Sequence, residues 1–251
     1  MNRGFKIIIP ARYQSSRFQG KALAEIAGKP MVQHVYERAQ QSGATSVVIA
    51  TDDERIRKVA QGFGAAVCMT SDQHQSGSDR LAEAVALLGY ADDEVVVNLQ
   101  SDEPLVPPGI LSQIVTGLLT HPAAQVATIC EPLTQTQKML DPNVAKVVRD
   151  QEGYALYFSR SPLPYARGFV ASEIKDLLPD VYYRHIGLYA ARVSFWQQYV
   201  KWGPCQLEEL EGLEQLRVLW HGGKIIVGVS SYASFMEVNT PEDLMKVRAL
   251  M

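Results

Sequence analysis

The chain has 251 residues, 47% of them hydrophobic, so it can bury about three quarters of its unfolded surface in a sizeable core. Its 24 basic and 27 acidic residues give a formal net charge of −3. This near balance argues against a nucleic-acid partner held by a broad basic surface, but a concentrated basic loop remains compatible with small anions.

The first predicted element is a strand at residues 7–9, where three isoleucines precede Pro10. In open α/β sheets, ligands bind beyond the carboxyl ends of parallel strands, where the next loop begins. That loop carries Arg12, Arg17 and Lys21 among small and polar residues. Guanidinium and ammonium groups suit a triphosphate, although a solvated basic loop is an equally simple interpretation.

Three further elements alternate between helix and strand. Residues 31–39 have apolar positions at helical spacing, and residues 46–50 read as a second strand. The residues at 51–53 then start a helix that turns Ile56 and Val59 inward. These elements serve as scaffold for the loops between them.

A hydroxyl-rich turn separates a short strand at 66–69 from a helix at 79–88. The turn contains Ser76, Gly77 and Ser78, so its amides and hydroxyls lie near a helix N-terminus that suits polar ligand groups. A plain capped helix start is the alternative interpretation.

The most convincing buried strand spans residues 95–100 and ends abruptly before Asp102. If it pairs in parallel with the strand at 7–9, this carboxylate lies beside the cationic loop. A carboxylate facing a triphosphate is repulsive unless a divalent cation lies between them, so Asp102 is the first candidate metal ligand. The alternative is an aspartate that makes a turn before Pro104.

A helix at 109–120 and a strand at 125–130 complete one more α/β step, after which the pattern changes. Strand-like runs at 144–149 and 154–160 form a predicted hairpin without a crossover helix, and a strand at 182–190 follows. We therefore expect an inserted antiparallel sheet.

Alternate residues of the strand at 182–190 share one face, which places Tyr183, His185, Gly187 and Tyr189 together. Gly187 leaves space between two polar rings. A single histidine in a strand is more often structural than functional.

Residues 206–221 are predicted to form one helix, with leucines around much of its circumference. At about 100° per residue, Glu214 falls between the directions of Leu207 and Leu210, and Arg217 lies beside Leu210. These charges need partners, and an internal ion pair would supply them.

The last elements are a strand at 224–229 and a helix near the C-terminus. Thr240 is the expected N-cap of that helix, with Pro241 at its first position and acidic residues next.

Several of these segments together resemble the CMP-Kdo synthetases, the cytidylyltransferases that activate 3-deoxy-D-manno-octulosonate (Kdo) for lipopolysaccharide. The matching segments are P-A-R-Y-x-S-S-R-F-x-G-K-x-L, H-Q-S-G-S-D-R, Y-F-S-R, R-H-x-G-x-Y and L-E-Q-L-R, and the resemblance extends along essentially the whole chain. It implies an α/β, Rossmann-like nucleotidyltransferase fold with a mainly parallel sheet flanked by helices and an inserted antiparallel sheet. It also implies Mg²⁺ as cofactor and a homodimer.

The resemblance assigns roles to individual residues. The catalytic residues would be Arg12, Lys21 and Asp102. The nucleotide-binding residues would be Pro10, Ala11, Arg12, Arg17, Lys21, Thr51, Asp52, Ser76, Gly77, Ser78 and Gln100. The sugar-acid-binding residues would be Gln100, Arg160, His185, Tyr189, Glu214 and Gln215, with Arg160 on the Kdo carboxylate. The metal ligands would be Asp102 and Asn239.

The chain departs from the family pattern at four positions. Ser101 stands where glycine is usual, and Gln19 and Ala22 replace two prolines of the first loop, which leaves that loop less restrained. Asn239 stands where the family has a metal-binding aspartate. Asparagine offers an uncharged oxygen, so we expect a metal to be held less strongly there, or through Glu237 or water.

We therefore expect one nucleotidyltransferase domain over residues 1–251. Residues 1–130 and 222–251 would form its nucleotide-binding core, and about 131–221 its sugar-acid-binding and dimerisation portion, with Trp196 and Trp202 in an apolar interface. The expected reaction transfers CMP from CTP to Kdo and releases pyrophosphate. The alternatives are the same reaction on an 8-amino Kdo analogue or a sialic-acid-like sugar, and a nucleotide-binding paralogue without turnover.

The sequence also predicts a cytoplasmic protein without membrane insertion. Cys68, Cys130 and Cys205 are odd in number and widely spaced, which fits neither a disulfide framework nor a cysteine zinc site. Pro10 interrupts the first apolar run, which is too short for a signal peptide, and prolines break the stretch at 104–130 that lacks Asp, Glu, Lys and Arg.

Overall fold

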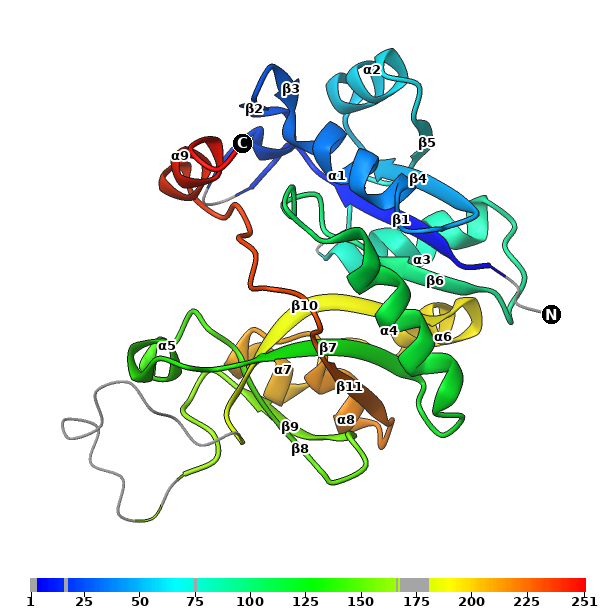
Figure 1. The fold of residues 1–251 in the computed structure, drawn as a ribbon. Helices are drawn as coiled ribbons and strands as arrows, with labels where there is room; N and C mark the ends of the chain where they lie inside the picture. Colours follow the sequence, from blue (N-terminus) through cyan, green and yellow to red (C-terminus); the bar gives the residue numbers. More distant parts are fainter. Residues whose placement is uncertain (1–3, 16–17, 75, 166, 168–180) are drawn as a thin grey trace.

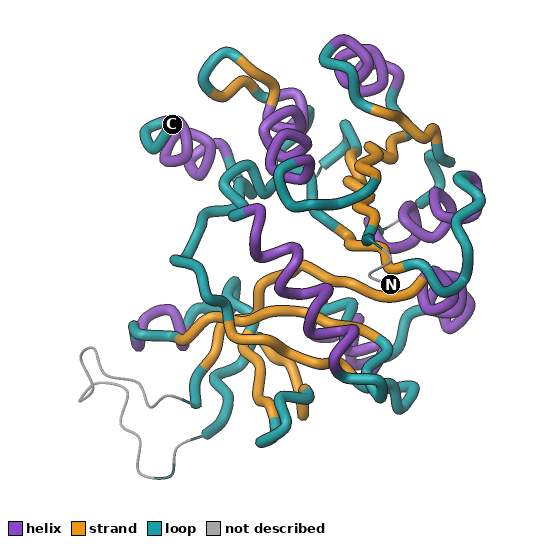
Figure 2. Tube along the Cα trace, turned by 45° about the vertical axis from the view of Figure 1, so that its right-hand side comes forward, coloured by secondary structure: helices purple, strands orange, loops and turns teal. Residues whose placement is uncertain are grey.

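The computed structural model describes residues 4–15, 18–74, 76–165, 167 and 181–251 (Figure 1). Within these residues, nine strands form one mixed sheet, and a second small sheet has two strands. Helices lie on both sides of the large sheet (Figure 2). The predicted α/β class, a mainly parallel sheet flanked by helices with additional antiparallel strands, is confirmed.

Four neighbouring strands of the large sheet run parallel. They are β1 (Lys6–Ala11), β4 (Ser46–Thr51), β5 (Ala66–Met69) and β6 (Val95–Asn98), in the order β5-β4-β1-β6. The three isoleucines of β1 are fully buried, as expected for a strand covered on both faces. Parallel pairing brings the carboxyl ends of β1 and β6 to the same edge of the sheet.

Two sets of helices cover the two faces. Buried side chains of α1 (Met31–Gln40), α2 (Glu54–Gly62) and α4 (Pro108–Thr120) pack in one core cluster with one face. Those of α3 (Gly77–Leu87), α6 (Val193–Trp202) and α8 (Leu216–Trp220) pack with the other. None of the helices in the described residues has the length and apolar content needed to span a bilayer.

The inward face of α2 differs from the prediction at one residue. Ile56 is fully buried, but Val59 is 36% exposed. Ala60, one turn after Ile56, is the second fully buried residue of the helix. Val59 therefore lies at the edge of the buried stripe.

The antiparallel strands belong to the large sheet as well. Strand β10 (Tyr183–Arg192) lies between β6 and β7 (Val126–Pro132) and is antiparallel to both. The predicted hairpin forms from β8 (Lys146–Arg149) and β9 (Ala155–Ser159), and β8 also pairs with β10. The edge strand β11 (Ile225–Val229) is parallel to β7.

The predicted helix at 206–221 is wrong, because the segment forms two short helices. Helix α7 (Gln206–Glu211) ends at Gly212, whose left-handed φ of 60° an L-residue adopts only with strain. Helix α8 begins at Leu216, so the turn between the helices changes every side-chain direction predicted from one continuous helix.

The charged residues of this segment therefore lie in positions other than those predicted from one continuous helix. Leu210 is 84% exposed and does not pack beside Arg217. An internal ion pair is present, but it joins Arg217 to Glu208 at 2.6 Å. Glu214 instead accepts a hydrogen bond from Ser78 at 2.8 Å.

The segment from β11 to α9 (Pro241–Arg248) leaves one edge of the large sheet and crosses to the side of the molecule that holds β1 and α1 (Figure 1). Thr240 caps α9 as predicted, because its hydroxyl accepts from the Asp243 amide at 3.2 Å while the Asp243 carboxylate accepts from the Thr240 amide at 3.0 Å. The other elements are the 3-10 helix η1 (Lys21–Leu23), α5 (Thr136–Leu140) and the β2–β3 pair (Glu25–Ile26 and Lys29–Pro30).

Trp196 does not contribute to an exposed interface. It is 3% exposed, and its indole nitrogen donates to the carbonyl oxygen of Val96 at 3.4 Å. Trp202 is half-buried and stacks on His221 with ring centroids 4.5 Å apart. The prediction of an interface is therefore wrong for Trp196, since that ring fills the core between α6 and the sheet.

Candidate active site

A cleft of about 160 Å³ opens at the carboxyl ends of β1 and β6. It is formed by the loop after β1, the turn before α3 and the loop after β6. The predicted residues that line it are Pro10, Ala11, Arg12, Lys21, Ser76, Gly77, Gln100 and Asp102. Ser15, a hydroxyl of the same loop that the sequence offered as a donor to phosphate, lines it too, and the lining residues that the prediction left out are Ala22, His74, Arg80 and Ser101. Arg17 lies outside the described residues.

Lys21 and Asp102 meet in this cleft. The Lys21 Nζ lies 2.5 Å from Asp102 Oδ2, although the two residues are 81 positions apart in the chain. Both side chains are mostly buried, with 13% and 20% of their surfaces exposed. The predicted juxtaposition of the cationic loop with the carboxylate after β6 is therefore confirmed.

The loop that delivers Lys21 is fixed by Gly20 and Tyr13. Gly20 has a left-handed φ of 70°, and its amide donates to the carbonyl oxygen of Tyr13 at 2.8 Å. A Cβ on Gly20 would lie 3.1 Å from the Tyr13 ring, so the position suits glycine for two separate reasons. The Tyr13 ring packs in turn against the Arg55 guanidinium, 3.3 Å from the ring centroid.

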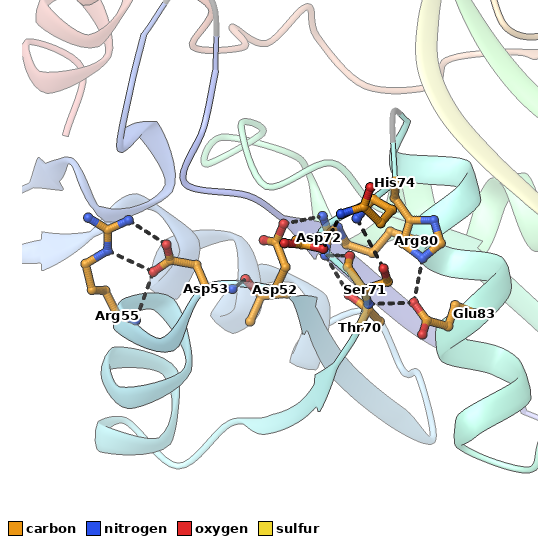
Figure 3. Close-up of polar contacts among 11 residues, drawn as sticks. Asp52, Asp53, Arg55, Thr70, Ser71, Asp72, His74, Arg80 and Glu83 are labelled. Carbon is orange, nitrogen blue, oxygen red and sulfur yellow. Dashed lines mark hydrogen bonds and ion pairs between the residues drawn. The ribbon is translucent and has the colours of Figure 1, made fainter.

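The predicted residues Thr51 and Asp52, at the end of β4, do not line the cleft, but Asp52 contacts the cleft residue Arg80 (Figure 3). Arg80, 3% exposed, donates to Asp52 Oδ2 at 2.9 Å and to Thr70 Oγ1 at 2.5 Å. The predicted residue Asp52 is thus oriented by a guanidinium of the cleft. Thr51 is fully buried and accepts from the Asp53 amide at 3.2 Å, so its hydroxyl supports the start of α2.

His74 also lines the cleft. Its Nε2 lies 2.5 Å from Glu83 Oε2, and that oxygen also accepts from the Ser71 amide at 2.8 Å (Figure 3). Burial raises the pKa of Glu83, but the hydrogen bonds from His74 and Ser71, together with the charges of His74 and Arg80, lower the pKa overall. His74 and Arg80 both belong to the segment H-Q-S-G-S-D-R, which was the sequence signal for their place in the cleft.

A second polar cluster lies on β10 and the turn before α8. The Tyr189 hydroxyl donates to Gln215 Oε1 at 3.0 Å, and Gln215 Nε2 lies 3.4 Å from His185 Nδ1. His185 Nε2 lies 2.9 Å from Thr128 Oγ1, which donates to the carbonyl oxygen of Leu188 at 2.7 Å. The Thr128 oxygen must therefore accept, so the imidazole carries its proton on Nε2 and accepts on Nδ1.

The second cluster is uncharged at neutral pH. Burial, and then the nearby Arg184 charge, lower the pKa of His185 to about 3, so its imidazole is neutral. Burial also raises the pKa of Tyr189, which keeps its hydroxyl protonated. Three predicted sugar-acid residues, His185, Tyr189 and Gln215, thus form one hydrogen-bonded group. Thr128 was not predicted from the sequence, because it is a single polar residue within the apolar run of β7.

Glu214 and Ser78 join the edge of this cluster. A cavity of about 10 Å³ borders Ser78, Tyr189, Glu214 and Gln215. Burial raises the pKa of Glu214, while the hydrogen bond from Ser78 partly opposes this effect. Ser78 is 2% exposed and does not line the nucleotide cleft, because its hydroxyl points to Glu214.

Arg160 belongs neither to the lining of the cleft nor to the second polar cluster. Its guanidinium donates to the carbonyl oxygens of Glu211 at 2.5 Å, Pro142 at 2.9 Å and Gly212 at 3.3 Å. Its own carbonyl oxygen accepts from the fully buried ammonium of Lys146 at 2.5 Å. The structure therefore places Arg160 at the C-terminal end of α7.

Asn239 follows Val238, whose backbone is hydrogen-bonded to that of Asp102. The Val238 amide donates to the carbonyl oxygen of Asp102 at 2.9 Å, and the Asn239 amide donates to Asp243 Oδ2 at 3.2 Å. No three His, Cys, Asp or Glu side chains of the described residues gather as a metal site. The donor types that Asp102 and Asn239 carry, one carboxylate and one amide oxygen, are compatible with Mg²⁺, which usually takes one or two carboxylates and completes its shell with phosphates and water.

Comparison with known proteins agrees with this geometry. A model of the cytidylyltransferase family matches residues 6–225. The chain is 51% identical over 245 residues to 3-deoxy-manno-octulosonate cytidylyltransferase of Coxiella burnetii (strain RSA 493 / Nine Mile phase I), with 98% of both chains covered. It is 50% identical over 254 residues to the protein of that name from Pasteurella multocida, again with 98% of both covered.

The fold comparison gives the same relationship. A solved structure of CMP:2-keto-3-deoxy-manno-octonic acid synthetase complexed with CTP superposes with a TM-score of 0.88. Its sequence is 42% identical, and the superposition covers 98% of each chain.

Proposed function

This chain belongs to the cytidylyltransferase family, and from that premise we infer that it transfers CMP from CTP to 3-deoxy-manno-octulosonate and releases pyrophosphate. The observation that carries this function is the Lys21–Asp102 pair, which places a cation and a carboxylate side by side in the cleft at the carboxyl ends of β1 and β6. The product, CMP-Kdo, would serve lipopolysaccharide synthesis.

The residues of the cleft act mainly by positioning and by stabilising charge. The anomeric hydroxyl of the sugar acid attacks the α-phosphorus in line, and charge spreads over the phosphoryl oxygens. Arg12 and Lys21 supply the cations that neutralise the triphosphate. Asp102 and Asn239 would hold Mg²⁺, which when bound would supply positive charge that stabilises the phosphates and would lower the pKa of the attacking hydroxyl.

The Lys21–Asp102 pair supplies one charged group for the triphosphate and one for a cation. Before a nucleotide binds, each charge of the pair neutralises the other, which reduces the cost of holding either in a mostly buried position. A triphosphate offers Lys21 new anionic partners, and the Asp102 carboxylate then becomes available to a cation. Lys21 and Asp102 change partners together, because each is the partner of the other before the nucleotide binds.

The second cluster is the proposed place of the sugar acid. His185, Tyr189 and Gln215 present neutral donors and acceptors, which suit sugar hydroxyls, and Glu214 lies beside them. The 10 Å³ cavity is far smaller than an eight-carbon acid, so these side chains must move apart when it binds. Arg160 would bind the carboxylate of the sugar acid in place of the backbone carbonyl oxygens that its guanidinium contacts in this structure.

We also propose a homodimer and a cytoplasmic location.

The test is pyrophosphate release from CTP and Mg²⁺, with Kdo added or omitted, for the natural chain and for Asn239→Asp. We expect release that depends on Kdo from the natural chain and faster release from the variant at low Mg²⁺, because a carboxylate holds the cation more strongly than an amide does. Release from the variant alone would contradict catalysis by the natural chain. If neither protein releases pyrophosphate, the function with Kdo is wrong, and the 8-amino analogue and sialic-acid-like acids would be assayed next.

A further inference from the structure

Asn98 is a fully buried amide in an otherwise apolar strand. It ends the run V-V-V-N of β6, lies between β1 and β10, and pairs in register with Ile8 and Tyr189. Burying an amide is unfavourable unless its polar atoms find hydrogen-bond partners. Because a leucine would fill such a position without that cost, the partners of Asn98 explain its presence.

Those partners form a continuous chain of side chains. Ser78 Oγ donates to Glu214 Oε2 at 2.8 Å, and Asn98 Nδ2 donates to Ser78 Oγ at 3.4 Å. Gln100 Nε2 donates to Asn98 Oδ1 at 3.3 Å. The chain therefore runs from Glu214 through Ser78 and Asn98 to Gln100.

The chemistry of the groups gives this chain a direction. The Ser78 hydroxyl has one hydrogen, and it is used in the hydrogen bond to Glu214 Oε2. The Ser78 oxygen must then accept from the Asn98 amide nitrogen, which leaves the Asn98 oxygen facing Gln100. Gln100 must donate in turn, and this fixes the orientation of its terminal amide.

The two ends of the chain lie in different pockets. Gln100 lines the nucleotide cleft, where its terminal amide is about 3.4 to 3.5 Å from the position of a Cβ on Gly77, at the start of α3. Glu214 borders the small cavity beside Tyr189 and Gln215. Asn98 and Ser78 are nearly inaccessible to solvent, at 0% and 2% exposure, so the connection passes through the protein interior.

We propose that Asn98 is a positioning residue that couples nucleotide binding to sugar-acid binding by holding Gln100, Ser78 and Glu214 in one directed hydrogen-bond chain. This proposal rests on the proposed function. A nucleotide that orders the Gln100 amide also orders Asn98, Ser78 and the Glu214 carboxylate. The sugar acid then binds a group that has already lost its conformational freedom, and its affinity rises.

The experiment measures the Kd of Kdo by calorimetry, with and without a CTP analogue that has a methylene between the α- and β-phosphorus atoms and cannot transfer CMP. The proteins are the natural chain, Asn98→Leu, Ser78→Ala and Ser78→Thr. Leucine keeps the volume of Asn98 without its polar atoms, and threonine keeps the hydroxyl that alanine removes. Thermal melting shows that each variant is folded.

In the natural chain we expect the analogue to tighten Kdo binding about fivefold or more, a usual size for coupling between two sites. Ser78→Thr should keep this factor, and Asn98→Leu and Ser78→Ala should reduce it below about twofold while still binding the analogue. A folded Asn98→Leu with undiminished coupling overturns the proposal, and so does a natural chain in which the analogue does not change the Kd. Pyrophosphate release by the same preparation separates these outcomes from a failure of the proposed function, because absent release with Kdo overturns both.

Discussion

At the scale of single residues, the cleft depends on charges that the fold brings together and keeps partly out of water. Lys21 and Asp102 neutralise each other at 2.5 Å, whereas Arg80 is held by Asp52 and Thr70. Charge-assisted contacts of this kind have fixed directions, so they can present donors to phosphate oxygens without large rearrangement.

Lys21→Ala should lower kcat much more than it lowers stability. Removing one donor that stabilises developing charge costs about 100-fold or more in kcat, while leaving the mostly buried Asp102 carboxylate without its partner costs about 1 to 3 kcal/mol of unfolding free energy. The measurements are pyrophosphate release at saturating CTP and thermal melting.

Lys29→Ala is the matched control for Lys21→Ala. Lys29 also forms a lysine–carboxylate pair, with Glu37 at 2.9 Å, but it does not line the cleft. We expect nearly natural kcat from it. A Lys21→Ala protein whose turnover falls only in proportion to its melting temperature would mean that Lys21 has a structural role alone.

At the scale of elements, turns decide where the functional side chains lie. Gly20 fixes the turn before η1 and so the position of Lys21, while Gly212 ends α7 and so separates Glu208 from Glu214. Both glycines adopt left-handed backbone angles, at φ of 70° and 60°. The glycine at 212 was the sequence signal for the end of α7, because leucine spacing alone does not show where a helix stops.

Gly20→Ala tests the turn that carries Lys21, and Gly28→Ala is its control. Both positions have left-handed φ, 70° and 77°, so alanine should cost about 1 to 2 kcal/mol of stability at each. Only at Gly20 does the new Cβ meet the Tyr13 ring, at 3.1 Å, whereas nothing lies within 4 Å at Gly28.

We therefore expect similar melting temperatures for these two variants but a larger loss of kcat/KM for CTP in Gly20→Ala, since the contact with Tyr13 displaces the loop. Steady-state kinetics with CTP as the varied substrate measures the difference. Equal kcat/KM values in the two variants would show that the Tyr13 contact does not position Lys21.

At the scale of the whole molecule, the two portions expected from the sequence share one sheet. Strand β10 belongs to the portion at 131–221, yet it pairs with β6 on one side and β7 on the other. Removing β10 would expose the edge of β6 and separate it from β7. The assignment of nucleotide and sugar-acid roles to the two portions stays a prediction, but their stabilities should not be separable.

Denaturant unfolding should therefore show one transition. Trp196, Trp202 and Trp220 all lie within 131–221, so tryptophan fluorescence reports on that portion, while far-UV circular dichroism reports on the whole chain. We expect the two curves to coincide at a fixed protein concentration. A fluorescence transition clearly separated from the dichroism transition would show that the portions unfold independently.

The sequence by itself determined most of the elements and many of the residues that line the cleft. Local periodicity identifies the strands that became β1 and β6, and parallel strands place their following loops at one edge, which is why Lys21 and Asp102 were predicted to meet. The cap at Thr240 is likewise local and was predicted correctly. The segment containing His74 and Arg80 was recognised, although these two residues were not selected.

Only the tertiary structure decided which strands are neighbours and which polar groups share a pocket. Alternation shows that Asn98 and Tyr189 each face one side of a strand, but it does not show that β10 inserts beside β6 and sets them opposite each other. The contacts of Ser78 with Glu214 and of Arg160 with the end of α7 join residues 136 and 51 positions apart. Periodicity describes the environment of one residue at a time, whereas such pairs are fixed by the packing of the whole chain.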